Sequence, residues 1–177
     1  INFIMDIENL SYPEAVEFLA KRANMPMPEE TNDAESRKRA RMLALNKDAA
    51  RFFYDQLSTP LGESAREYIG KRQIRPATVK RFGLGAAPDD WSLLLNAMEK
   101  KGYTGQELFE AGLARRGKNG GYYDTFRNRL MFPVIDVRGN VIGFSGRILG
   151  DGEPKYMNSP ETLVFNKSRN LFALNLA

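Results

Sequence analysis

The sequence contains neither cysteine nor histidine. Within these 177 residues this excludes disulfides, metal sites built from thiolate or imidazole ligands, and catalysis by cysteine or histidine. No apolar run approaches the roughly 18 residues that a membrane-spanning helix needs. The chain starts at Ile1 without a methionine or a charged-then-apolar leader. These absences predict a soluble, cytoplasmic chain without a membrane partner, cut from a longer protein.

The net charge of the chain is negative in its first 60 residues and positive in the remainder. Residues 1–60 carry 8 basic and 10 acidic side chains, whereas residues 61–177 carry 18 basic and 12 acidic side chains. A basic part next to an acidic one indicates a polyanionic partner for the basic part, although a solvated surface is the alternative explanation.

Helical patterns dominate the first two thirds of the sequence, and β-rich patterns dominate the last third. The first predicted helix is capped by Ser11, and three more span 31–57, 63–71 and 75–82. A fifth helix is capped by Asp89 or Asp90 and ends at about Lys100, and a sixth starts at Thr104. Residues 24–30 are predicted as a linker, 82–86 as a short strand, and 115–121 as a basic loop. The single tryptophan, Trp91, is assigned to the core. This order predicts an α+β fold.

The clearest local signal is a β-hairpin. Two runs of β-branched and aromatic residues, 130–135 and 141–144, flank the turn sequence Asp136-Val137-Arg138-Gly139-Asn140. Cations surround this hairpin, and Asn158 lies between them in a predicted loop that is flanked by glycine and proline. Such a sheet suits the binding of a polyanion, because Arg and Lys neutralise phosphates and Arg can donate two parallel hydrogen bonds.

The segments FRNRLMFPVIDVRGNVIGFSGR, PKYMNSPET and FNKSRNLFAL, in this order, resemble bacterial DNA primase of the DnaG type. The likeness is to the N-terminal part of its RNA-polymerase core, and weaker likeness extends through YIGKRQI and VKRFGLG to FIMDIENLSYPEAVEFLAKRA. The resemblance implies linker helices followed by a mixed helical and antiparallel-sheet subdomain. Residues 1–30 would be the tail of a zinc-binding module with its linker, and 31–177 the N-terminal subdomain of the core.

The family uses basic residues of these motifs to hold template DNA and the RNA–DNA product. Carried over residue by residue, the expected nucleic-acid or nucleotide ligands are Arg72, Arg127, Arg129, Arg147, Lys155, Asn158 and Lys167. Strand parity predicts that Arg127 and Arg129 project to one face. The chain departs from the family at Thr125, where an arginine phosphate contact is lost, and at Ser145, where a glycine is usual.

The carboxylates that a polymerase needs for two divalent metals are not evident. The family carries them in a Toprim module, which would begin about where this sequence stops, and it carries zinc in a module before it. The resemblance therefore implies no cofactor in this chain, with zinc and Mg²⁺ or Mn²⁺ in other modules of the whole protein. The fragment alone is expected to be inactive.

The resemblance thus implies part of a DNA-directed RNA polymerase that makes short RNA primers. Expected partners are single-stranded template, RNA–DNA hybrid and ribonucleotides, with a replicative helicase bound through a domain not present here. The alternative is an inter-domain or protein-interaction module that binds no nucleic acid itself.

Overall fold

The computed structural model describes residues 1–8, 10–23, 25 and 34–167. Its helices are α1 (Asn2–Glu8), α2 (Tyr12–Arg22), α3 (Ala34–Gln56), the 3-10 turn η1 (Pro60–Gly62), α4 (Glu63–Lys71), α5 (Pro76–Phe82), α6 (Leu93–Glu99) and α7 (Gly105–Glu110). Its strands are β1 (Gly85–Ala87), β2 (Ala114–Arg116), β3 (Tyr122–Asp124), β4 (Arg129–Ile135), β5 (Val141–Ile148) and β6 (Tyr156–Asn158). The predicted α+β class is confirmed.

The predicted hairpin forms the centre of a four-stranded antiparallel sheet with the order β1-β4-β5-β6. Its turn is held by Asp136, whose Oδ1 accepts hydrogen bonds from the backbone N–H groups of Arg138 (2.9 Å) and Asn140 (2.8 Å). Gly139 supplies the left-handed conformation that the turn requires, with φ 85°. β5 continues beyond the predicted end at residue 144, because it pairs with β4 on one side and β6 on the other.

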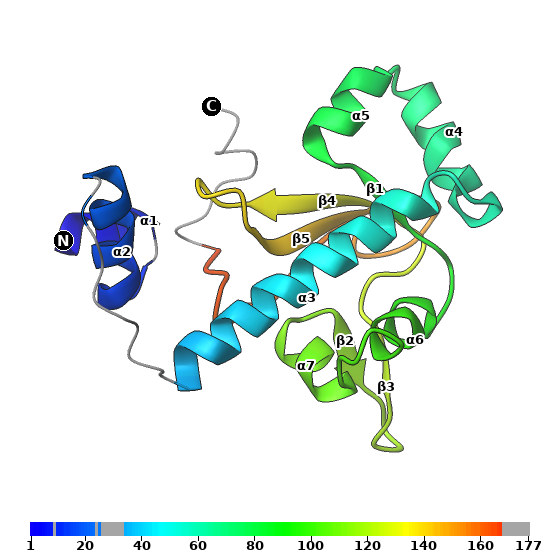
Figure 1. Cartoon of the computed structure of the whole chain (residues 1–177). Helices are drawn as coiled ribbons and strands as arrows, with labels where there is room; N and C mark the ends of the chain where they lie inside the picture. The colour runs from blue at the N-terminus through cyan, green and yellow to red at the C-terminus, as the bar shows by residue number, and fades with distance from the viewer. Residues whose placement is uncertain (9, 24, 26–33, 168–177) are drawn as a thin grey trace.

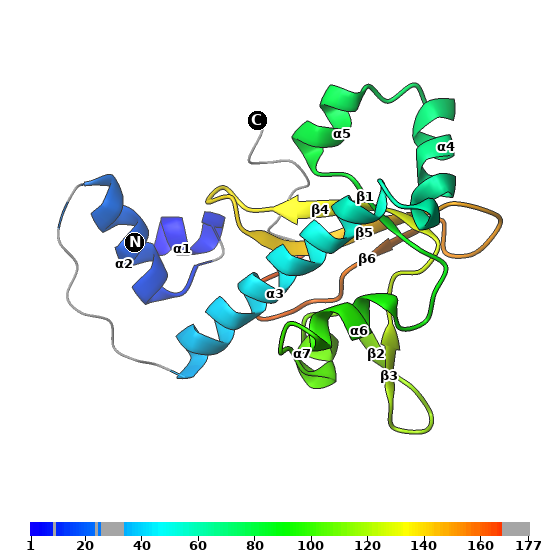
Figure 2. The same cartoon turned by 45° about the vertical axis from the view of Figure 1, so that its right-hand side comes forward.

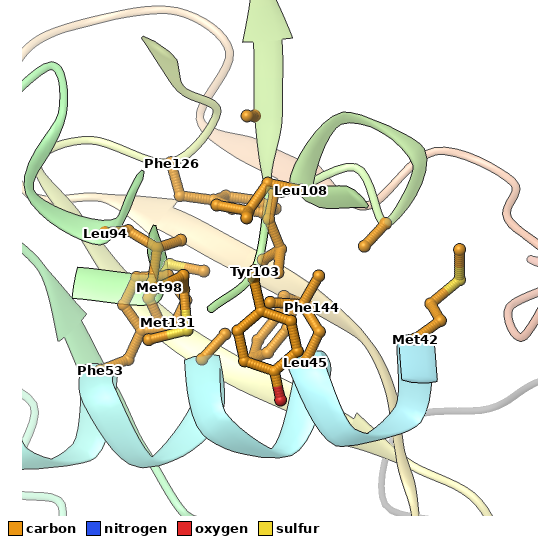
Figure 3. Close-up of a cluster of buried hydrophobic side chains, with 14 of the residues drawn as sticks. Met42, Leu45, Phe53, Leu94, Met98, Tyr103, Leu108, Phe126, Met131 and Phe144 are labelled. Atoms are coloured by element: carbon orange, nitrogen blue, oxygen red, sulfur yellow. The ribbon is translucent and has the colours of Figure 1, made fainter. Parts of the chain in front are cut away.

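The long helix α3 packs on one face of this sheet, as Figures 1 and 2 show. Its apolar residues Met42, Leu45, Ala49 and Phe53 are buried and meet residues of the sheet and of α6 and α7 (Figure 3). Phe53 of α3 lies edge-to-face on Phe144 of β5, with ring centroids 5.5 Å apart. Edge-to-face rings of this kind add to the free energy of burying both aromatics, so this contact fixes how α3 crosses the sheet.

Helices α4 and α5 cover the opposite face of the sheet. Leu130 of β4 points into this second core with Ala65 of α4, whereas its neighbour Met131 points into the α3 core. This alternation is the period-two pattern of a strand buried on both faces. α6, α7 and the β2–β3 hairpin lie on the far side of α3 from α4 and α5 (Figures 1 and 2).

Three local predictions were wrong. Residues Arg115 and Arg116 belong to strand β2, paired with β3, and not to a flexible loop. Asn158 lies in strand β6, paired with Ser145 of β5, and not in a loop. α6 begins at Leu93, not at Asp89 or Asp90, because its first amides are capped by a residue distant in sequence, described below.

The carboxylate of Glu14 links the N-terminal helix pair to the rest of the structure. Glu14 of α2 accepts hydrogen bonds from Ser11, as the predicted cap implies, and lies 2.6 Å from Arg39 of α3 and 3.8 Å from Arg138 of the β4–β5 turn. Helix α1 was not predicted. The predicted linker 24–30 and the start of α3 before Ala34 lie outside the described residues, apart from Met25. In the described part, no helix has the length and apolarity to cross a membrane.

Candidate nucleic-acid interface

Two arginines that the motifs single out flank one tyrosine on the α4 side of the sheet. Arg147 of β5 donates from Nε to the hydroxyl of Tyr68 at 3.2 Å, and its guanidinium lies 5.4 Å from the Tyr68 ring centroid. Arg72, which follows α4, lies 5.4 Å from the same centroid. Burial alone would raise the pKa of Tyr68, but the hydrogen bonds and charges of Arg147 and Arg72 outweigh it and lower the pKa. The guanidiniums of Arg147 and Arg72 are therefore two positive charges that Tyr68 holds near each other.

A hollow of about 490 Å³ lies next to this pair. Asn158, Ser145 and Lys167 bring polar groups to it. Its remaining lining consists of Phe132, Val134, Tyr156 and Phe165. Asn158 and Ser145 are cross-strand partners, so their side chains share one face of the sheet. Amide and ammonium donors above an apolar lining can bind a flat, charged ligand such as a nucleotide.

Arg129, also predicted as a ligand, is a structural residue in this conformation. It is 3% exposed, and its Nη1 donates to the carbonyl oxygens of Gly146 (3.1 Å) and Pro154 (3.0 Å). Burial lowers its pKa, and the nearby charges of Arg127, Arg115 and Arg147 lower it further. Arg129 thereby joins β5 to the loop before β6, and its buried guanidinium is not accessible to a phosphate.

The prediction that Arg127 and Arg129 project to one face is wrong. Arg127 precedes β4, and the intervening Asn128 has a left-handed backbone with φ 49°, which breaks the strand parity. The Arg127 guanidinium instead lies 4.0 Å from the Trp91 ring and 5.4 Å from the Tyr123 ring, and it donates to the Asp124 carbonyl oxygen.

Trp91, assigned to the core from its apolarity, is 64% exposed. Its indole packs at 5.4 Å against Tyr123, and its carbonyl oxygen accepts a 2.8 Å hydrogen bond from the Asp124 N–H. The adjacent pair Asp89-Asp90 is a sequence signal that could have indicated a surface position, because charged residues avoid burial. An exposed indole held against a guanidinium is a surface on which a nucleic-acid base can stack.

Asp124 of β3 holds the start of α6 in place next to Trp91. Its buried carboxylate accepts hydrogen bonds from the N–H groups of Leu94 (2.7 Å) and Leu95 (2.9 Å), so it caps α6 across 29 and 30 residues of sequence. Burial raises the pKa of Asp124 despite these hydrogen bonds. The carboxylate therefore stabilises a helix end and is not presented to a ligand.

The accessible cations of the interface lack carboxylate partners. In the regions that the structure describes, no carboxylate oxygen lies within 4.0 Å of the side-chain nitrogens of Arg72, Arg127, Arg147, Lys155 or Lys167. Lys155 is exposed, and its carbonyl oxygen accepts from Ile148 N–H at 3.1 Å. Charges without local partners remain available to an incoming polyanion.

Acidic side chains do not gather in the same way. Among the described residues, no three carboxylates are placed to hold a metal ion. The carboxylates of Asp124 and Asp136 are engaged by backbone N–H groups. Within the described residues, the charged side chains that gather on this surface are therefore cations and not carboxylates.

Comparison with known proteins identifies the family to which this chain belongs. The family described as "DNA primase catalytic core, N-terminal domain" matches residues 52–177. A DNA primase of Clostridium acetobutylicum is 44% identical over 180 residues, covering 100% of this chain and 30% of that protein. The DNA primase of Escherichia coli strain K12 is 40% identical over 178 residues, covering 98% of this chain and 31% of that protein.

Solved structures show the same likeness. The DnaG primase catalytic domain bound to single-stranded DNA matches with a TM-score of 0.75 and 39% identity, over 79% of this chain and 45% of that chain. The RNA polymerase domain of Mycobacterium tuberculosis DnaG, in complex with double-stranded DNA with a 6-nucleotide overhang, matches with a TM-score of 0.74 and 39% identity, over 78% of this chain and 44% of that chain. The chain spans less than a third of its curated relatives' length. Because the family model matches most of the sequence and the two relatives match nearly all of it, the chain belongs to the DnaG-type DNA primase family, and residues 52–177 are the N-terminal domain of that family's catalytic core.

Proposed function

We propose that this chain binds single-stranded template DNA and the short primer–template duplex as part of a DNA primase. The observation that carries this proposal is a set of exposed or half-buried cations without carboxylate partners among the described residues: Arg72, Arg127, Arg147, Lys155 and Lys167. Related catalytic domains in complexes with single-stranded DNA and with an overhanging duplex support it.

Each part of the surface suits a different part of the polymer. The guanidiniums of Arg147 and Arg72, held around Tyr68, neutralise backbone phosphates. Trp91, supported by Arg127, offers a face on which a base stacks without sequence preference. Asn158 offers an amide that can both donate to and accept from a base or a nucleotide.

The remainder of the activity would come from parts of the protein outside these residues. Residues 1–30 would be the tail of a zinc-binding module with its linker, and residues 31–177 the N-terminal subdomain of the polymerase core. Zinc and the Mg²⁺ or Mn²⁺ that supports nucleotidyl transfer would be held by other modules, as would the contact with a replicative helicase. Ribonucleotides would enter beside Lys155, Asn158 and Lys167, in the bacterial cytoplasm.

The second candidate is a protein-interaction module, and the exposed apolar residues of the N-terminal helices favour it. Phe3 is 72% exposed, Tyr12 is 59% exposed and Ile7 is 50% exposed. Such residues near one another can mark a docking surface. This candidate predicts no affinity for nucleic acid, whereas the first predicts affinity that falls steeply with salt.

Fluorescence anisotropy of a labelled single-stranded oligonucleotide separates the two candidates. Arg147→Ala and Lys155→Ala should each weaken binding about equally across sequences, because phosphate contacts carry no sequence information. Arg51→Ala is a matched control, because Arg51 lies on α3 and is already paired with Asp55 at 2.9 Å. Equal affinity of all four proteins would contradict the assignment of the interface to this sheet.

A further inference from the structure

The segment 63–82, which comprises α4, α5 and their connection and is called here the α4–α5 arm, concentrates positive charge. It contains six basic residues, Arg66, Lys71, Arg72, Arg75, Lys80 and Arg81, against two acidic residues, Glu63 and Glu67. Both carboxylates belong to α4, so the half from Arg75 to Phe82 carries cations alone. Arg75, Lys80 and Arg81 are exposed.

These three cations differ from those on the opposite side of the molecule. On α3, Lys38 lies 2.8 Å from Glu110 and Arg41 lies 2.8 Å from Glu107. No carboxylate oxygen of any described residue lies within 4.0 Å of the side-chain nitrogens of Arg75, Lys80 or Arg81. Paired charges cancel at a distance, so the arm has a larger uncompensated positive charge than the first turns of α3, where only Arg37 has no carboxylate of a described residue within 4.0 Å.

The arm also differs from the interface on the sheet, because it offers no base-stacking face. Trp91 and Tyr156 are exposed at 64% and 58%, whereas segment 63–82 exposes no large apolar side chain. Its aromatics, Tyr68 and Phe82, are half-buried against the second core. Cations without aromatic platforms fit a polymer whose phosphates are accessible and whose bases are already stacked and paired, which is a duplex.

The arm is placed to continue the interface on the sheet. Figures 1 and 2 both show α4 and α5 standing away from α6 and α7, on the other side of α3. The link between arm and sheet is Tyr68, whose ring is flanked by Arg72 of the arm and Arg147 of β5. A nucleic acid in contact with Arg147 therefore meets the arm next.

We propose that Arg75, Lys80 and Arg81 of the α4–α5 arm bind the phosphate backbone of a nucleic-acid duplex adjacent to the single-strand track. This proposal rests on the proposed function, because it assigns the double-stranded part of the same ligand. It adds three residues that are not among the ligands expected from the resemblance, and it gives the arm a role distinct from that of the sheet.

The test compares two probes on the 177-residue chain by fluorescence anisotropy: a short single strand, and a duplex that carries the same single strand as an overhang. The variant combines Arg75→Ala, Lys80→Ala and Arg81→Ala. Its affinity for the single strand should stay within about twofold, while its log-log salt slope for the overhang duplex should lose up to about 2.7, or roughly 0.9 for each phosphate contact removed.

Two further proteins exclude trivial explanations. A triple control, Arg37→Ala, Lys47→Ala and Arg51→Ala, removes the same charge from α3 and should leave the duplex slope as in the wild type. The charge-keeping variant Arg75→Lys, Lys80→Arg, Arg81→Lys should retain duplex binding. Thermal melting by circular dichroism confirms that each variant is folded before its binding is compared.

The outcomes separate the two proposals. An unchanged duplex slope in the arm variant, with the wild type binding both probes, would overturn the arm assignment and leave the track on the sheet intact. An equal loss for both probes, or the same loss in the α3 control, would also overturn it. A wild type that binds neither probe at low salt would contradict the proposed function itself.

Discussion

At the scale of single residues, the glycine at position 146 of the motif GFSGR is required because other side chains pack closely against its backbone. A Cβ atom on Gly146 would lie 2.9 Å from Cδ of Arg129, 3.1 Å from a ring carbon of Phe126 and 3.2 Å from the sulfur of Met131. The glycine lets the buried Arg129 lie flat across β5 and reach the carbonyl oxygens that it satisfies. Arg147 then points from the next position to the opposite face.

Gly146→Ala should therefore destabilise the fold, by about 1–3 kcal/mol, because the methyl group has no space without moving packed side chains. Gly150→Ala is the matched control. A Cβ atom added at Gly150 would lie no closer than 3.7 Å to another heavy atom, the amide nitrogen of Asn128. Urea denaturation of both variants measures the difference. Equal stability of the two variants would show that the approach at Gly146 is readily relieved.

The two predicted ligand arginines Arg129 and Arg147 should respond differently to the same change. Arg129→Met removes the side-chain donor to the carbonyl oxygens of Gly146 and Pro154 and should cost about 1–3 kcal/mol of folding free energy. Arg147→Met should cost less stability but should weaken single-strand binding, because Arg147 is only half-buried and has no carboxylate of a described residue within 4.0 Å. Parallel melting and anisotropy measurements check this; a stable Arg129→Met variant with lost affinity would reverse the assignment.

The sequence indicates which residue types gather here, but not which of them remain accessible. Asn158 and Lys167 line one hollow, and Arg147 shares the sheet face of Ser145 and Asn158. The exposure of Trp91 and the burial of Arg129 could not be read from the pattern, because both depend on contacts made across the sheet. A single left-handed residue, Asn128, was enough to separate Arg127 from the parity of β4.

At the scale of elements, most helices were predictable because their start and stop signals are local. α4 has the predicted bounds, and α7 starts at the predicted Thr104 cap, whose Oγ1 accepts from Glu107 N–H at 3.2 Å. α6 was predicted with the wrong start, because its cap is Asp124, a residue of β3. A cap supplied through the tertiary fold leaves no signal next to the helix.

Asp124→Ala should remove both acceptors of the α6 N-terminus and cost about 1–3 kcal/mol of folding free energy. Ser92→Ala is the control at the same helix end, because Ser92 makes no side-chain cap hydrogen bond and should cost about 0.5 kcal/mol or less. Thermal denaturation, followed by circular dichroism and by Trp91 emission, measures both. Similar melting temperatures of the two variants would contradict the role of Asp124.

The docking of α2 should depend on pH through Glu14. Burial alone would raise the pKa of this carboxyl, but the hydrogen bonds from Ser11 and the charges of Arg39 and Arg138 outweigh it and lower the pKa below its ordinary value of 4.5. A carboxyl with a lower pKa in the folded than in the unfolded state stabilises the fold fully above the unfolded value, and this stabilisation is lost as pH falls through the folded pKa.

The melting temperature of the wild type should therefore fall more steeply below pH 4.5 than that of Glu14→Gln, which cannot titrate. Above that pH the wild type should be the more stable of the two. Parallel acid dependences of the two proteins would contradict a stabilising role for the ionised carboxylate.

At the scale of the whole molecule, charge pairing divides the surface. On α3, Lys38, Arg39 and Arg41 are each paired with a carboxylate from another element, whereas the exposed Arg37 and Lys47 have no carboxylate of a described residue within 4.0 Å. On the sheet and the α4–α5 arm, the accessible cations of the proposed interface have no such partner among the described residues. The sequence predicted a basic part from its charge balance, but only the fold shows which cations are neutralised. This division is the physical basis for expecting nucleic acid on one side.

The most direct measurement uses the intrinsic emission of Trp91, the single tryptophan of the chain and an exposed part of the proposed track. The folded chain is titrated with a short single-stranded oligonucleotide at increasing salt. Stacking of a base on the indole should quench the emission, and four phosphate contacts should give a log-log salt slope of about −2.8. Unchanged emission without binding at low salt would contradict a single-strand track on this surface.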